Sequence, residues 1–137
     1  MIKFVIGAKG SGKTGRLVDE LNRLAMDEQL NIVCLEKGDR LDRQVKPQIR
    51  LVDVSQYPVN GYRELLSFIA GIAAKDFDIT DLYIDSINKV TGSDCREELA
   101  QFVKELEQFI QGHAMKVTIL LSISPEEMPE SLKPYIS

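Results

Sequence analysis

One glycine-rich octapeptide constrains the fold of this chain more than any other part of its sequence. The letters GAKGSGKT span Gly7–Thr14 and directly follow the apolar run Ile2–Ile6. A short, continuous apolar run rich in β-branched residues is typical of a buried strand. Apolar residues then recur at helical spacing: Leu17, Val18, Leu21, Leu24 and Ala25. The octapeptide is therefore predicted to form a loop that joins a strand to a helix.

This kind of loop suits a phosphate group. Glycines allow backbone conformations that other residues avoid, so several N–H groups can point into one concavity. The unpaired N–H groups at the start of the next helix also favour an anion. Lys13 is expected to reach the β- and γ-phosphates of a nucleotide, and the Thr14 hydroxyl is expected to ligate Mg²⁺. The predicted phosphate-binding residues are Gly7, Ala8, Lys9, Gly10, Ser11, Gly12, Lys13, Thr14 and Gly15.

The octapeptide satisfies the pattern GxxxxGK[ST] without substitution and resembles the Walker A motif of the P-loop NTPase superfamily. The resemblance implies a three-layer α/β/α fold with a mostly parallel sheet of about five strands. It also implies ATP or ADP and Mg²⁺ as cofactors. Lys9 lies one place later than the additional lysine of partition-type ATPases, so the loop resembles the ordinary form of the motif.

Apolar runs and helical patterns alternate along the rest of the chain, which favours parallel strands joined by right-handed crossovers. The length of 137 residues is expected to give a single domain over 1–137. Further strands are predicted at 31–35, 49–54, 81–85 and 116–123, with an edge strand at 135–136. Helices are predicted after a cap at Asn60, over 94–111 and after a capping box at Ser124, the last ending before Pro134.

A second magnesium ligand is expected at the end of the predicted strand 81–85. Three apolar residues lead into Asp85, and ligands of open α/β sheets bind at the carboxyl ends of the strands. In P-loop proteins an aspartate at such a strand end holds magnesium together with the hydroxyl of the loop. Asp85 is therefore predicted to lie close to the Thr14 hydroxyl, whereas Asp81 is interpreted as a surface charge.

Hydrolysis requires a group that orients the attacking water. Many ATPases of this superfamily place a glutamate directly after the magnesium aspartate, but that place holds Ser86. The segments NIVCLE and IDS resemble the RecA-like branch, in which a glutamate ends the strand after the first helix. This resemblance implies a catalytic role for Glu36 and a γ-phosphate contact for Ser122. Alternatively, Glu36 is merely the first residue of a charged loop, and Ser122 is a buried serine whose hydroxyl forms a hydrogen bond with the backbone.

The longest polar stretch, 37–46, carries cations at every third position: Lys37, Arg40, Arg43 and Lys46. A solvated surface paired with its own aspartates is the favoured interpretation, since such pairs contribute only tenths of a kcal/mol. Arg40 or Arg43 could instead contact a nucleotide on a neighbouring subunit. The same stretch is also the one candidate for the lid that a small-molecule kinase needs.

Composition and net charge limit the partners and the cellular location that we expect for the protein. A net charge of −4 makes nucleic acid an unfavoured partner, and no apolar run is long enough to insert into a membrane. Two cysteines without a pattern, Cys34 and Cys95, and an N-terminus without a secretory signal predict a cytoplasmic location. ATP is favoured over GTP because the segment Asn88–Thr91 lacks the aspartate of an NKxD-type guanine motif.

The loop, the YIDS segment and the tail PEEMPESL together resemble small bacterial P-loop proteins that are loosely tagged as twitching-motility or pilus-retraction ATPases. The pilus-retraction motors carry a further N-terminal domain and histidine-containing boxes, and this chain has one histidine. Only nucleotide binding is therefore expected from the resemblance. The favoured hypothesis is an ATP-binding protein with weak hydrolysis that serves an unidentified protein partner or forms a homo-oligomer. The alternatives are a small-molecule kinase and a non-hydrolysing, nucleotide-dependent interaction module in which Glu36 faces solvent.

Overall fold

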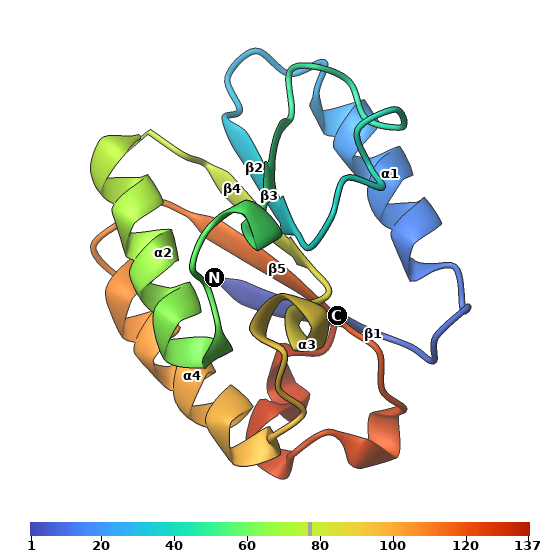
Figure 1. Cartoon of the computed structure of the whole chain (residues 1–137), viewed down its shortest axis with the longest axis vertical. Coiled ribbons are helices and arrows are strands. Elements are labelled where there is room, and N and C mark those ends of the chain that lie inside the picture. The colour runs from blue at the N-terminus through green and yellow to red at the C-terminus, as the bar shows by residue number, and fades with distance from the viewer. Residues whose placement is uncertain (77) are drawn as a thin grey trace.

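The computed structural model describes residues 1–76 and 78–137 as an α/β fold around one parallel sheet (Figure 1). All five strands pair in parallel, in the order β1-β5-β4-β2-β3. They span β1 Ile2–Ile6, β2 Ile32–Glu36, β3 Arg50–Asp53, β4 Asp81–Asp85 and β5 Lys116–Leu121. The predicted α/β class and the five-stranded parallel sheet are confirmed.

The helices connect these strands. They span α1 Lys13–Leu24, α2 Gly61–Lys75, α3 Ile87–Thr91 and α4 Arg96–Ile110, with 3₁₀ turns η1 Val54–Gln56, η2 Pro125–Glu127 and η3 Glu130–Tyr135. The step from β1 to β2 crosses the sheet in one direction, and the steps from β3 to β4 and from β4 to β5 run the other way. Right-handed crossovers therefore put α1 on one face and α2 and α4 on the opposite face. Figure 1 shows this arrangement, with the sheet between them.

Two apolar clusters fill the spaces on either side of the sheet. One contains Leu17 and Leu21 of α1 with Cys34 and Tyr83 of the sheet. The other packs residues of α2, α3 and α4 against the alternate strand positions, such as Ile84. Because successive strand residues point to opposite faces, positions two residues beyond Cys34 and Tyr83 also point toward α1. Those positions are Glu36 and Asp85, at the carboxyl ends of β2 and β4.

Several predicted boundaries differ from the structure. Asn60 is the N-cap of α2, but its side chain makes no capping hydrogen bond; its backbone N–H instead donates to Glu64 Oε1 at 2.6 Å. Ser124 likewise makes no side-chain cap, and Pro125 opens a 3₁₀ turn rather than an α-helix. The final turn continues through Pro134, because a short 3₁₀ turn tolerates the loss of one N–H donor.

The chain end adds one bridge rather than a strand. Ile136 pairs in parallel with Phe4, beside the outer edge of β1. The short helix α3 was not predicted, because its five residues are too few to show helical periodicity. None of the described helices combines the length and the apolar character that crossing a bilayer requires.

Burial of α1 against the sheet is expected to stabilise the fold measurably. Leu21 is fully buried in the cluster under α1, whereas Met26, just beyond the helix, is exposed. Leu21→Ala should lower the free energy of unfolding by about 3 kcal/mol, because it removes buried methyl groups and leaves a cavity. Met26→Ala is the matched control and should change it by less than about 0.5 kcal/mol. Urea denaturation of both variants measures the difference; equal effects would contradict the described packing.

Candidate functional site

The loop between β1 and α1 takes backbone conformations that favour glycine. Gly10 and Gly12 have φ angles of +84° and +87°, in the left-handed region. At Gly7 a Cβ would lie 2.6 Å from Ser11 Oγ, so the Ser11 side chain would have to move aside. The Ser11 N–H donates to the Ala8 carbonyl at 3.0 Å, which closes the loop into a tight turn. The loop is therefore a concave backbone turn, and the Lys13 side chain lies across it.

The start of α1 faces this concavity without a side-chain cap. Gly12 occupies the N-cap position and supplies no capping side chain, and no acidic residue lies in the first turn. The first N–H groups of a helix have no partner within the helix and carry partial positive charge. A phosphate placed there would accept their hydrogen bonds, so the local backbone fits an anion.

Lys13 brings a positive charge to the same place. Its side chain is buried, and its Nζ donates to the Ala8 carbonyl at 3.1 Å across the loop. Burial lowers the pKa of Lys13, while the nearby Asp85 carboxylate raises it. The positive charges of Arg16 and Lys89 lower the pKa further, so cations gather around this lysine. An anion bound in the loop would offset both the burial and the mutual repulsion.

Thr14 and Asp85 meet although they lie 71 positions apart in the sequence. The Thr14 hydroxyl donates to Asp85 Oδ2 at 3.2 Å. The predicted proximity of Asp85 to the Thr14 hydroxyl is therefore found. Both groups can offer an oxygen atom to a metal ion, and oxygen is the ligand type that Mg²⁺ prefers. The pair therefore offers two adjacent oxygen ligands beside the phosphate-binding loop.

Glu36 lies beside Asp85 in the sheet. The two residues are register partners of β2 and β4, and both side chains point toward the α1 face. Glu36 is only 2% exposed, and its Oε1 has no hydrogen-bond partner. Burial raises the pKa of Glu36 to about 7, an effect that the Leu41 N–H and the Arg40 guanidinium oppose. The hypothesis that Glu36 faces solvent is therefore wrong for this structure.

The segment 37–49 covers Glu36 and is fixed to α1. Leu41 is fully buried in the cluster under that helix. Asn22 of α1 donates to the Gln44 carbonyl at 2.8 Å and accepts from the Lys46 N–H at 2.8 Å. These three contacts hold the segment against the domain, which is unlike a lid that stands open.

The predicted self-pairing of this segment is not found. The ion pairs among the described residues lie elsewhere: Arg50–Asp76, Arg96–Glu127 and Lys133–Glu130. Arg40 instead acts electrostatically on Glu36 of its own chain. Asp53 Oδ1 accepts a hydrogen bond from the Gly38 N–H at 2.7 Å. The start of the segment is therefore held by a backbone N–H that donates to a carboxylate, and not by an ion pair.

Three further polar residues lie at this edge of the sheet. Ser122 directly follows β5 and is half-buried, beside β1, whose last residue Ile6 pairs with Leu121. Ser86 and Asn88 come immediately after β4, and their side-chain oxygens are buried without partners. The sequence predicted no role for Ser86 or Asn88. Ser86 drew notice only as the residue in the place of a glutamate and as part of the IDS segment, and Asn88 only in the near match of Asn88–Thr91 to a guanine motif.

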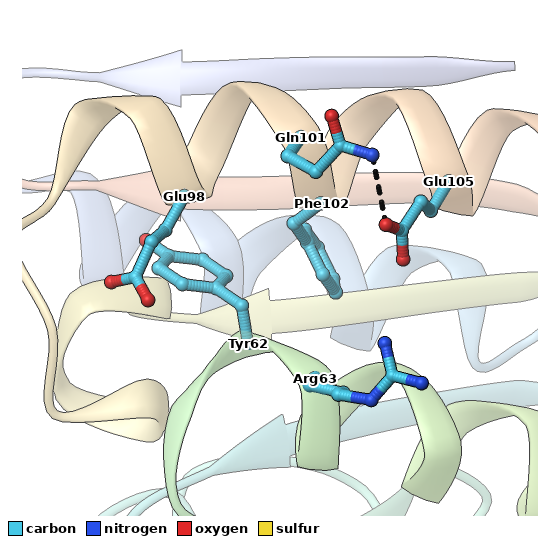
Figure 2. Close-up of a pocket in the computed structure, with 6 residues that line it drawn as sticks. All are labelled: Tyr62, Arg63, Glu98, Gln101, Phe102 and Glu105. Carbon is cyan, nitrogen blue, oxygen red and sulfur yellow. Dashed lines mark hydrogen bonds between the residues drawn. The ribbon is translucent and has the colours of Figure 1, made fainter.

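A cleft of about 210 Å³ between α2 and α4 lies on the other face of the sheet (Figure 2). Figure 2 shows Arg63 on α2 facing α4, which carries Glu98, Gln101 and Glu105. Its aromatic walls, Tyr62 and Phe102, are almost fully buried, with ring centroids 5.3 Å apart. Two carboxylates against one guanidinium disfavour an anion there. The cleft is therefore a poor candidate for phosphate, in contrast to the loop.

Comparison with models of known protein families finds none that matches, and comparison with curated proteins finds no significant relative.

The buried Glu36 is expected to make stability depend on pH. Its pKa is about 7 in the folded protein and near 4.5 when unfolded, so only the folded state keeps this proton between those values. Stability should therefore fall as pH rises from about 4.5 to 7. Across this window the free energy of unfolding of Glu36→Gln should rise relative to that of the wild type by on the order of 2–3 kcal/mol, since glutamine carries no charge.

Denaturant titrations of both proteins at pH 4.5, 6 and 8 measure this difference. Glu28→Gln removes one exposed carboxylate and controls for the change in net charge. A difference between wild type and Glu36→Gln that stays constant with pH would contradict the burial of Glu36.

Proposed function

We propose that this protein binds ATP with Mg²⁺ at the loop Gly7–Thr14 and hydrolyses it slowly. The observation that carries the proposal is the uncapped start of α1, which directly follows the glycine loop and begins with a buried lysine. The Thr14–Asp85 hydrogen bond adds the oxygen pair that a magnesium ion needs next to the phosphates. The match of the sequence to Walker A supports the same proposal.

Each residue of the site has a distinct role in this proposal. Backbone N–H groups of the loop and of the first turn of α1 hold the phosphates. Lys13 neutralises their charge, while Thr14 and Asp85 hold the magnesium ion, which stabilises the negative charge of the reacting phosphate when bound. Ser122 directly follows the strand that lies between β1 and β4, and its proposed role is to contact the γ-phosphate.

Glu36 is the proposed acceptor of a proton from the attacking water. A general base works best when its pKa is close to the working pH, and burial raises the pKa of Glu36 to about 7. Its unpartnered Oε1 leaves one acceptor available. Glu36 is only 2% exposed, which agrees with slow rather than rapid turnover. A protein partner or a second copy of the chain would then distinguish the nucleotide-bound protein from the nucleotide-free protein.

Nucleotide binding should raise thermal stability. At one hundred times its dissociation constant, MgATP should add about 2.7 kcal/mol to the free energy of unfolding and raise Tm by several degrees. Lys13→Ala should abolish most of this shift, because the variant loses the buried cation of the loop. Lys75→Ala removes an exposed lysine at the end of α2 and is the matched control. An unchanged Tm of the wild type in saturating MgATP would contradict the proposal.

Turnover should depend on Glu36. Glu36→Gln should lower the rate of phosphate release at least tenfold, since general-base catalysis contributes about 10²–10⁴-fold. The wild-type rate should rise with pH through the pKa of about 7, because the carboxylate must lose its proton before it can accept one. Asp81→Asn, at the opposite end of β4, is the control and should keep the wild-type rate. ATP binding with equal, near-zero turnover in wild type and Glu36→Gln would favour the non-hydrolysing interaction module.

A further inference from the structure

Among the described helices, α1 alone lies on its face of the sheet. The helices α2 and α4 lie together on the opposite face (Figure 1). The apolar cluster under α1 takes buried residues from β2, β4 and β5, whereas β1 contributes only the partly buried Val5. Both faces of a parallel sheet are normally covered by helices. On the α1 face, therefore, β1 lacks the helix that this rule predicts.

A groove follows α1 along this part of the sheet. Two hollows of about 210 and 320 Å³ form it. They share four lining residues: Lys3, Glu20, Tyr83 and Thr118. The first hollow extends to Arg16 in the first turn of α1, and the second extends to Arg23 in its last turn. The groove therefore runs along most of the length of this helix.

Basic side chains outnumber acidic ones in the groove. The basic lining residues are Lys3, Lys13, Arg16, Arg23 and Lys116. None of them belongs to an ion pair among the described residues. The acidic lining residues are Glu20 and Asp81, and Glu20 already accepts a hydrogen bond from the Tyr83 hydroxyl at 2.7 Å. The whole chain has a net charge of −4, so the groove is a basic surface on an acidic protein and favours an acidic occupant.

The groove also contains apolar residues that an occupant would cover. Met1 is 74% exposed at one end, and Val5 is half-buried on the floor. A helix is about 10 Å wide and neighbouring strands lie about 4.8 Å apart, so one helix covers two strands such as β1 and β5. An amphipathic helix with an apolar stripe and acidic flanks therefore matches both the width and the charge of the groove.

A second copy of this chain is a poor occupant. Two copies of the same basic groove would repel each other across a symmetric interface. The strongly exposed large apolar residues among those described are Met1, Met26 and Tyr57, and none of them lies in a helix. The described helices therefore offer no exposed stripe of large apolar residues for the groove of another copy. Nucleic acid is also disfavoured, because its phosphates would meet Glu20 and Asp81.

We propose that this groove binds an acidic amphipathic helix of a partner protein. The apolar stripe of that helix lies against Val5 and Met1, and its carboxylates lie beside Lys3, Arg23 and Lys116. The proposal goes beyond nucleotide binding and does not depend on it, because none of these five residues belongs to the phosphate-binding loop or to the magnesium pair.

NMR titration of the nucleotide-free, ¹⁵N-labelled chain tests the proposal. A strand of five or six residues is about 17–20 Å long, and about 12–14 helical residues span that length. The probe is a side-chain-stapled peptide of this length, with leucines at helical spacing on one face and glutamates elsewhere. The amide signals of Lys3, Val5, Arg23 and Lys116 should move, whereas those of the cleft between α2 and α4 should not. The same peptide with lysines in place of the glutamates should bind at least about tenfold more weakly, because like charges then meet at the groove.

Charge reversal in the groove should weaken binding of the acidic peptide. The double variant Arg23→Glu with Lys116→Glu changes two exposed side chains and should lower the affinity at least about tenfold. Lys75→Glu with Lys104→Glu makes the same change in net charge at exposed positions of α2 and α4 and is the matched control. Arg23→Gln with Lys116→Gln is the milder pair if the reversal prevents folding.

Three results of the titration would overturn the proposal: no amide signal moves at about 1 mM peptide, the lysine peptide binds equally well, or the groove and control variants lose the same affinity. Larger shifts of the same amides with a single-stranded oligonucleotide would identify a nucleic-acid site instead. A dimer in sedimentation that the groove variant abolishes and the control keeps would identify a second copy as the occupant. Loss of acidic-peptide binding in the groove variants alone supports the proposal.

Discussion

The common direction of the five strands determines where chemistry can occur in this protein. Parallel pairing places the carboxyl ends of all strands at one edge, and the residues that follow them meet there. Thr14, Glu36 and Asp85 come from three distant parts of the sequence and reach the same edge for this reason. The sheet order also places β5 between β1 and β4, which brings Ser122 between the glycine loop and Asp85.

The buried polar groups at the carboxyl ends of the strands are energetically costly, and the apolar clusters on both faces of the sheet compensate for this cost. A buried polar atom without a partner costs about 1–3 kcal/mol, and Glu36, Ser86 and Asn88 each contribute one. Lys13 adds a buried cation whose charged form burial disfavours. Fully buried leucines and isoleucines on both faces of the sheet supply the opposing free energy. A chain selected for stability alone would have no reason to keep so many unsatisfied groups at one place.

Sequence patterns predicted the strands well because buried parallel strands are continuous apolar runs, as in Ile2–Ile6 and Asp81–Asp85. The contact between Thr14 and Asp85 was also expected, since Asp85 ends one predicted strand and Thr14 ends the loop that follows another. The cover over Glu36 could not be predicted, because it depends on the burial of Leu41 and on hydrogen bonds of Asn22 with backbone groups more than twenty residues away. Nor could α3, whose five residues are ordered by tertiary packing rather than by propensity.

The two hydrogen bonds of Asn22 have a mechanical consequence. They tie the last turn of α1 to the segment that follows Glu36, and the first turn of the same helix follows the glycine loop. One end of α1 is thus joined to the segment 37–49, and the other end begins at the glycine loop. A tilt or slide of α1 would therefore also displace the segment beside Glu36, which links the exposure of this carboxylate to the position of the glycine loop.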